Sequence, residues 1–158
     1  MNSSQAQALR NLLKTQQVAS LGTLHKDEPY VSMVPFALIP GGRGFVIHVS
    51  QLAAHTKDMI ANAAVSLLVV APHEPEAPVQ ALERATIQGR ARKFADTDPD
   101  YRDARRAYLS RFPQSEEMFG FSDFSLFVIV PHSVRHIGGF AQAATLTAET
   151  LANILSEA

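Results

Sequence analysis

The stretch Tyr30–Leu38 (YVSMVPFAL), the segment Pro40–Gly44 (PGGRG) and the stretch Phe45–Val49 (FVIHV) decide the fold of this chain. The middle segment predicts a tight turn, because glycine supplies the positive φ that hairpin turns need. The apolar stretches on either side of it are predicted strands. Strands joined by so short a connection pair in antiparallel fashion.

Further strands and helices are predicted on both sides of this hairpin. Connections between strands are short, and strands and helices do not alternate regularly enough for a doubly wound parallel sheet. We expect one mainly-β domain over residues 1–158, an antiparallel β-barrel with peripheral helices, and an α+β layered sheet is the alternative. The other predicted strands are Val18–Leu24, Val65–Ala71, Arg84–Phe94, Phe124–Val130 and Val134–Gly139, and the predicted helices are Gln5–Gln17, Gln51–Asn62, Asp98–Arg111 (with Asp98 as N-cap) and Thr147–Leu155.

Composition excludes several classes of function. The chain has no cysteine, which excludes disulfides, thiolate metal sites and a cysteine nucleophile. Its 14 basic and 15 acidic residues argue against general nucleic-acid binding, which needs a basic surplus. The longest apolar run, Leu67–Ala71, is too short to cross a membrane. The first residues lack the basic and apolar regions of a signal peptide, so we expect a cytoplasmic protein.

The segment Ser50–Lys57 (SQLAAHTK) follows a predicted strand and opens a predicted helix. A helix N-terminus presents unpaired N–H groups and the positive end of its dipole. Hydroxyls from Ser50 and Thr56, the imidazole of His55 and the ammonium group of Lys57 would add donors that suit a phosphate group. The alternative is that Ser50 caps the helix and Lys57 is solvated.

Other chemically capable residues carry no recognisable site. We expect exposed or hydrogen-bonded histidines and no metal centre, because the histidines lie on different elements and lack ligand spacing. The arginines of the third helix are expected to form a solvated face. Nucleophile-elbow, Walker and dinucleotide-binding motifs are absent. These histidines are His48, His73, His132 and His136, and these arginines are Arg102, Arg105, Arg106 and Arg111.

Several motifs in order resemble the pyridoxamine 5'-phosphate oxidase-like, FMN-binding split-barrel superfamily, and within it the haem-utilisation (HugZ-like) branch. The resemblance covers about Leu9 to Leu146. The motifs that carry it are Gly22–Leu24, Pro29–Pro35, Ser50–Met59, Ser66–Val69, Arg84–Gly89, Tyr108–Pro113, Asp123–Phe124 and Gly138–Phe140.

The resemblance implies a homodimer with two FMN sites at its interface. The strand at Ser32, Met33, Val34 and Pro35 would pass along the flavin ring, and the segment with Ser50, His55, Thr56 and Lys57 would hold the phosphate. Residues Arg84 and Gln88 would approach from the partner subunit, and Phe140 would close over the ring. It assigns no metal ligand and no catalytic residue.

Two departures from the family pattern affect this implied site. Thr56 stands beside Lys57 where family members often carry a second cation, and Ala141–Ala143 replaces a Gly-Arg-Ala run of the haem-utilisation branch. No histidine follows His136, so the histidine loop that would ligate haem is not recognisable. We expect a flavin-dependent oxidoreductase acting on an unknown small molecule. The alternatives are a haem-binding or haem-degrading protein, a split barrel that uses a deazaflavin such as F420, and a non-catalytic dimer.

Overall fold

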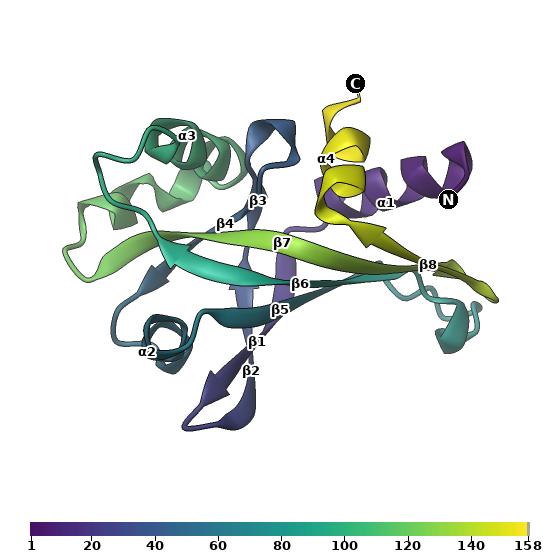
Figure 1. The fold of residues 1–158 in the computed structure, drawn as a ribbon, viewed down its shortest axis with the longest axis horizontal. Helices are drawn as coiled ribbons and strands as arrows, with labels where there is room; N and C mark the ends of the chain where they lie inside the picture. The colour runs from purple at the N-terminus through teal and green to yellow at the C-terminus, as the bar shows by residue number, and fades with distance from the viewer. Residues whose placement is uncertain (158) are drawn as a thin grey trace.

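The structure, a computed structural model, describes residues 1–157, and Figure 1 labels its helices and strands. The α-helices are α1 (Ser3–Thr15), α2 (Ala54–Ala61), α3 (Tyr101–Arg111) and α4 (Ala148–Ser156). The strands are β1 (Val18–His25), β2 (Glu28–Pro35), β3 (Ala37–Leu38), β4 (Phe45–Ser50), β5 (Ala64–Val70), β6 (Arg84–Lys93), β7 (Phe124–Gly139) and β8 (Gln142–Thr147). The short 3-10 helices are η1 (Pro40–Gly42), η2 (Val79–Ala81) and η3 (Pro113–Gly120).

All these strands belong to one antiparallel sheet in the order β2-β1-β5-β6-β7-β4-β3, with β8 paired to β7. Strand β7 pairs with β6 along most of its length, with β4 through its first half and with β8 through its second half. Helices α1, α3 and α4 lie along one side of the sheet, and the β1–β2 hairpin extends from the other (Figure 1). This curled sheet with helices at its periphery is a split barrel, which confirms the predicted fold class.

Strand β7 is continuous, so the prediction of two strands here was wrong. Its register with β6 shifts where Gln88 pairs with Ser133 and Gly89 pairs with Pro131. His132 is therefore the extra residue of a β-bulge, and a bulge tolerates a proline that has no N–H to donate. The strand continues through Pro131 for that reason.

Gly89 is needed opposite this bulge. A Cβ atom at that position would lie 2.5 Å from the carbonyl oxygen of Val130. Real Cβ atoms do not approach backbone that closely, so the two strands would have to separate. The bulge and the glycine together let β6 and β7 stay in contact over their full overlap.

The structure differs from the sequence prediction at two other strands. The sequence Gln142–Thr147 forms β8, although it lacks the apolar alternation that predicts a strand. The predicted strand Tyr30–Leu38 is divided, because β2 pairs with β1 whereas β3 pairs with β4. Between them the N–H of Phe36 donates to the carbonyl of Gln17 at 3.0 Å, which marks where the chain leaves β1 for β4.

Helix α3 starts later than predicted, and its arginines are not all solvated. The Asp98 carboxylate accepts from the Ala95 N–H and from Arg92 instead of capping the helix. Arg111 donates to the carbonyls of Phe36 (2.9 Å) and Leu13 (3.1 Å), so it ties α3 to the body of the protein. The Arg105 guanidinium stacks on the Phe119 ring, and the exposed members of the group are Arg102 and Arg106.

His48 belongs to a second core between β4 and α3, where it is buried against aromatic rings. Its ring stacks on Phe119 with centroids 3.9 Å apart, and its Nδ1 has no hydrogen-bond partner within residues 1–157. Burial, aided by the charge of Arg105, lowers the pKa of His48 to about 4, so it is neutral near pH 7. The expectation of an exposed or hydrogen-bonded histidine was wrong here. It holds for His136, which is also buried but pairs with Glu83 at 2.9 Å.

The main core fills the curl of the sheet and is closed by α1 and α4. Its members come from most strands and from both helices. Fully buried examples are Leu9, Leu13, Leu21, Ile47, Leu67, Ile87, Ile129 and Leu151.

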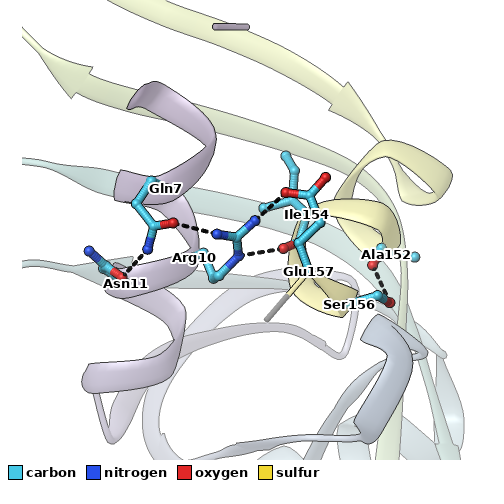
Figure 2. A network of polar contacts seen from close by, with 7 residues as sticks. All are labelled: Gln7, Arg10, Asn11, Ala152, Ile154, Ser156 and Glu157. Carbon is cyan, nitrogen blue, oxygen red and sulfur yellow. Dashed lines mark hydrogen bonds and ion pairs between the residues drawn. The ribbon is translucent and has the colours of Figure 1, made fainter. Parts of the chain in front are cut away.

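Arg10 joins the two helices that close this core (Figure 2). Its Nε donates to the carbonyl of Ile154 at 2.6 Å, its Nη2 pairs with Glu157 at 2.6 Å, and its Nη1 donates to Gln7. The side chain is almost fully buried, whereas the carboxylate of Glu157 is exposed. The bond to the Ile154 carbonyl therefore contributes most, because exposed ion pairs are worth little.

Replacing Arg10 by leucine should destabilise the fold. We expect Arg10→Leu to lower the free energy of unfolding by about 1.5–3 kcal/mol, the range for hydrogen bonds that involve a charged group. Urea denaturation followed by circular dichroism measures this loss. The matched control is Arg106→Leu on α3, where the side chain is exposed, and we expect a change within about 0.5 kcal/mol. Equal losses in the two variants would contradict the prediction.

Candidate functional site

The segment Ser50–Lys57 forms the junction between β4 and α2, as predicted, but its hydroxyl groups bond within the protein. The Ser50 hydroxyl donates to the Asp123 carboxylate at 3.0 Å and accepts from the N–H of Leu52 at 3.1 Å. The buried Thr56 hydroxyl donates to the carbonyl of Ser50 at 2.7 Å. Ser50 does not cap α2, whose N-cap position is Ala53. These two hydroxyls stabilise the junction and are not free donors.

Other donors at the junction remain available. The backbone N–H groups of Ala54 and His55 make no backbone hydrogen bond within residues 1–157, as expected for the first turn of a helix. Lys57 is exposed and forms no ion pair with any described residue. The Asp123 carboxylate beside Ser50 works against a bound anion. Lys57 is therefore the one cation that the segment itself offers to a phosphate group.

Ser32 and His55 are brought together by the fold. The Ser32 hydroxyl lies 3.2 Å from Nδ1 of His55, which links β2 to the first turn of α2. Burial lowers the pKa of His55, and the nearby Asp58 carboxylate opposes that effect. Two residues from separate parts of the implied site thus lie side by side on one face of the β1–β2 hairpin.

The other residues predicted along the flavin ring point to opposite faces of β2. Met33 pairs with Ser20 and lies on the outer face of the sheet, where its side chain is 62% exposed. Val34 points into the main core, so its side chain cannot form a wall for a ligand on the surface. Pro35 is partly exposed on the Met33 face.

Strand pairing places Arg84 and Gln88 on this same outer face. Gln88 pairs with Ser66 on β5, and Arg84 pairs with Val70 two pairs further along. Because alternate residues share a face, the outer face runs from β2 across β1 and β5 to β6. The apolar residues exposed there are Val18, Val31 and Met33.

The predicted site residues nevertheless lie in two separate groups within one chain. Arg84 pairs with Ile137, close to the β7–β8 turn where Phe140 is 81% exposed. Ser50 pairs with Phe124 at the opposite end of β7. Nine residues of β6 correspond to about 30 Å, so Arg84 and Phe140 do not meet Lys57 within the chain.

A polar cluster that sequence analysis missed lies beside the junction. His25 Nδ1 is 2.7 Å from Oδ1 of Asp58, and the hydroxyl of Thr23 donates to Oδ2 at 2.9 Å. Asp58 is separated from both partners by more than thirty residues, so no local motif indicates the contact. The one indication in the sequence is that Asp58, a charged residue, stands beside Met59 on the apolar side of the predicted helix.

Neither a membrane span nor a multidentate metal site occurs in the described part of the chain. No helix within residues 1–157 is long and apolar enough to cross a membrane. No group of three histidine, aspartate or glutamate side chains in the same range is placed to hold a metal ion.

The chain is similar in sequence to a plant protein and in structure to bacterial proteins. The chain is 33% identical over 143 residues to the non-canonical heme oxygenase HOZ, chloroplastic, of Arabidopsis thaliana, covering 89% of this chain and 42% of that protein. It is 28% identical to a heme binding protein from Mycobacterium smegmatis whose structure superimposes with a TM-score of 0.85, covering 97% of this chain and 62% of the other. The chain therefore spans less than two thirds of either relative.

HutZ from Vibrio cholerae shares the fold, with a TM-score of 0.71 over 88% of this chain and 91% of the other at 18% identity. The family model for pyridoxamine 5'-phosphate oxidase matches residues 6–138. That match covers strands β1 to β6 and β7 up to Gly138, and it includes α2 and the Ser50–Lys57 junction. The chain belongs to the pyridoxamine 5'-phosphate oxidase family.

Proposed function

We propose that this protein binds haem, and that it degrades haem as the name of its Arabidopsis relative indicates. The observation that carries the proposal is that the Arabidopsis relative at 33% identity and the Mycobacterium relative at 28% identity are both named for heme, and the structure of the second superimposes closely. The flavin-dependent oxidoreductase expected from the sequence becomes the second candidate.

The residues of this chain fit haem in kind. A haem needs apolar surface for its ring, one or two protein ligands for its iron and cations near its propionates. Exposed apolar side chains lie on β2, among them Val31 and Met33, on the face of the strand opposite to the one that carries Ser32. Histidines with an accessible nitrogen lie on β1 and α2, and Lys57 is unpaired among the described residues. A haem ligand set is smaller than the three-residue metal group that residues 1–157 lack, so that absence does not conflict with haem.

Spectroscopic titration tests haem binding directly. We expect added haem to give a shifted Soret band that saturates at one haem per chain, with reductant and oxygen then bleaching it. Protein unfolded in urea is the control for nonspecific association. A titration that shows only the free-haem spectrum would contradict the proposal, and a bound but stable haem would limit it to binding.

We also propose that the protein is a homodimer, with its outer sheet face at the interface. Support comes from the distance within one chain between the Lys57 group and the Arg84–Phe140 group, since a second copy supplies the missing half to each site. The exposed apolar residues on the outer face give such an interface its hydrophobic contacts.

A charge on the outer face should separate the two copies. We expect Met33→Glu to shift the protein from dimer to monomer at micromolar concentration, because a carboxylate would be buried without a partner at the interface. Light scattering coupled to size-exclusion chromatography measures the mass. Phe121→Glu, at an exposed position outside the sheet, is the control and should leave the mass unchanged. A wild-type protein that is already monomeric would overturn the proposal.

FMN binding is the second candidate, and the family match favours it. The phosphate would bind at the junction through Lys57 and the free N–H groups of Ala54 and His55, with the ring along Ser32, Met33 and Pro35. Partner residues Arg84, Gln88 and Phe140 would complete the site. The cytoplasmic location stays a prediction of the sequence.

Removing the ammonium group tests this second candidate. We expect Lys57→Ala to weaken FMN binding by about 1.5–3 kcal/mol, the value of a charged hydrogen bond to phosphate. Quenching of flavin fluorescence measures the affinity, and Lys14→Ala on α1 is the control with an unrelated exposed lysine. An unchanged affinity in Lys57→Ala would remove the junction from the site, and no quenching in the wild type would remove FMN.

A further inference from the structure

A cavity of about 360 Å³ adjoins the second core, between β4, the end of α3 and η3. Its lining is mostly apolar and aromatic and includes the buried rings of Tyr108 and Phe112 and the half-buried ring of Phe124. The exposed residues Val18 and Gln114 also line it. The cavity therefore opens to solvent between the start of β1 and η3.

The lining of this cavity carries no charge. No lysine, arginine, aspartate or glutamate among residues 1–157 contributes to it. Its two titratable groups are neutral near pH 7, because burial lowers the pKa of His48 to about 4 and raises the pKa of Tyr108 to about 12. An ion brought into such a place would be costly, since nothing compensates its charge. The cavity suits a neutral molecule.

His48 is the polar residue of the lining that lacks a partner. The residue is 8% exposed, and its Nδ1 is fully buried without a hydrogen bond. Its Nε2 also forms no hydrogen bond with any residue of the described chain. Its nearest rings, Phe119 at 3.9 Å and Phe124 at 5.2 Å between centroids, have no polar atom to offer. Buried polar groups are nearly always paired, and a phenylalanine would fill this place without the cost of an unpaired imidazole.

The chemistry of His48 favours a hydroxyl group on the ligand. A neutral imidazole has one N–H and one lone pair, and no neighbour fixes which nitrogen holds the proton. A hydroxyl group can donate or accept, so it pairs with His48 in either tautomer. His48 and Phe124 also line a second, smaller cavity of about 200 Å³ together with the polar residues Gln51 and Lys93. The polar end of a ligand is therefore expected beside His48.

The volume and the walls of the larger cavity suit one or two aromatic rings. An apolar cavity of about 150 Å³ is known to hold benzene, so this one has room for a substituted ring or a fused pair. Aromatic side chains pack on flat rings in offset or edge-to-face arrangements. The thioether of Met118, which also lines the cavity, makes favourable contacts with ring edges.

We propose that this cavity binds a small neutral hydroxyaromatic molecule of the phenol or naphthol class. The ring of the ligand packs among Tyr108, Phe112 and Phe124, and its hydroxyl group forms a hydrogen bond with His48.

The site differs from those proposed for haem and FMN. Neither His25, His55 nor Lys57 lines it. It shares Pro35 with the surface proposed for the flavin ring, and Val18 and Pro35 place its mouth at the border of the proposed dimer interface. The inference does not rest on haem binding, so it is tested on protein free of haem and flavin.

Phenol and toluene are matched probes for the hydrogen bond, because they have nearly the same shape and differ in the hydroxyl group. Each is titrated into the protein, and NMR chemical shifts give its dissociation constant. We expect His48→Phe, which keeps a flat ring beside Phe119, to retain toluene. The preference for phenol over toluene should fall at least about fivefold from wild type to this variant, the value of one hydrogen bond between neutral groups. His73→Phe, at an exposed position outside the cavity, is the control and should keep the wild-type preference.

Filling the mouth tests where the probes bind. We expect Val18→Trp to weaken both probes severalfold, because the larger side chain would occupy the entrance. Val79→Trp on η2 is the matched control, since Val79 is exposed and does not line the cavity. It should leave both affinities unchanged.

Each contrary result overturns a stated part of the proposal. A wild-type protein that binds neither probe at millimolar concentration overturns the site. Equal affinities in the two tryptophan variants would place the probes elsewhere on the surface. An unchanged preference in His48→Phe overturns the role of His48, and imidazole nitrogen signals of His48 that do not move in wild type saturated with phenol lead to the same conclusion without a variant. None of these results bears on haem, so the proposed function is judged separately.

Discussion

The pairing of β7 with β6 is the contact on which the rest of the structure depends. It joins the half of the sheet that ends in β2 to the half that ends in β3, and it carries β8 and the exposed Phe140 turn on its far end. The bulge at His132 and the close approach at Gly89 let this pairing run past a proline. Because the pairing is long, it also keeps Arg84 apart from Ser50. Any site that uses both ends of it has to draw on two copies of the chain.

Local patterns in the sequence were sufficient for most of the fold. Glycines predicted the turn at Pro40–Gly44, and the change from strand to helical periodicity located the junction before α2. Those local patterns do not predict contacts between residues that are distant in the sequence. Whether a hydroxyl such as that of Ser50 is free or already bonded depends on Asp123, which lies 73 residues away. The same holds for His25 and Asp58. Of the donors named for a phosphate, the hydroxyls of Ser50 and Thr56 are already used inside the protein.

Flavin mononucleotide and haem differ in how the protein must neutralise the charge of the ligand. A phosphate dianion held against protein needs several donors and cations, since burying it without compensation is costly. The junction offers one lysine, two backbone amides and an opposing carboxylate, after Ser50 and Thr56 are accounted for. Haem carries its charge on propionates that remain in water, and its ring needs apolar surface and a ligand for iron. The exposed apolar Val31 and Met33 lie on the outer face of β2, whereas His25 and His55 lie on its other face.

The burial of Asp58 is hard to explain by stability alone. Placing an ionised carboxylate in the interior costs several kcal/mol, and well-packed apolar residues often stabilise a fold as well as a buried charge pair does. The structure nevertheless surrounds Asp58 with one hydroxyl and one imidazole, and the imidazole is the partly exposed member of the group. Burial of the carboxylate with a partly exposed histidine fixes the orientation of the His25 ring and ties the end of β1 to α2.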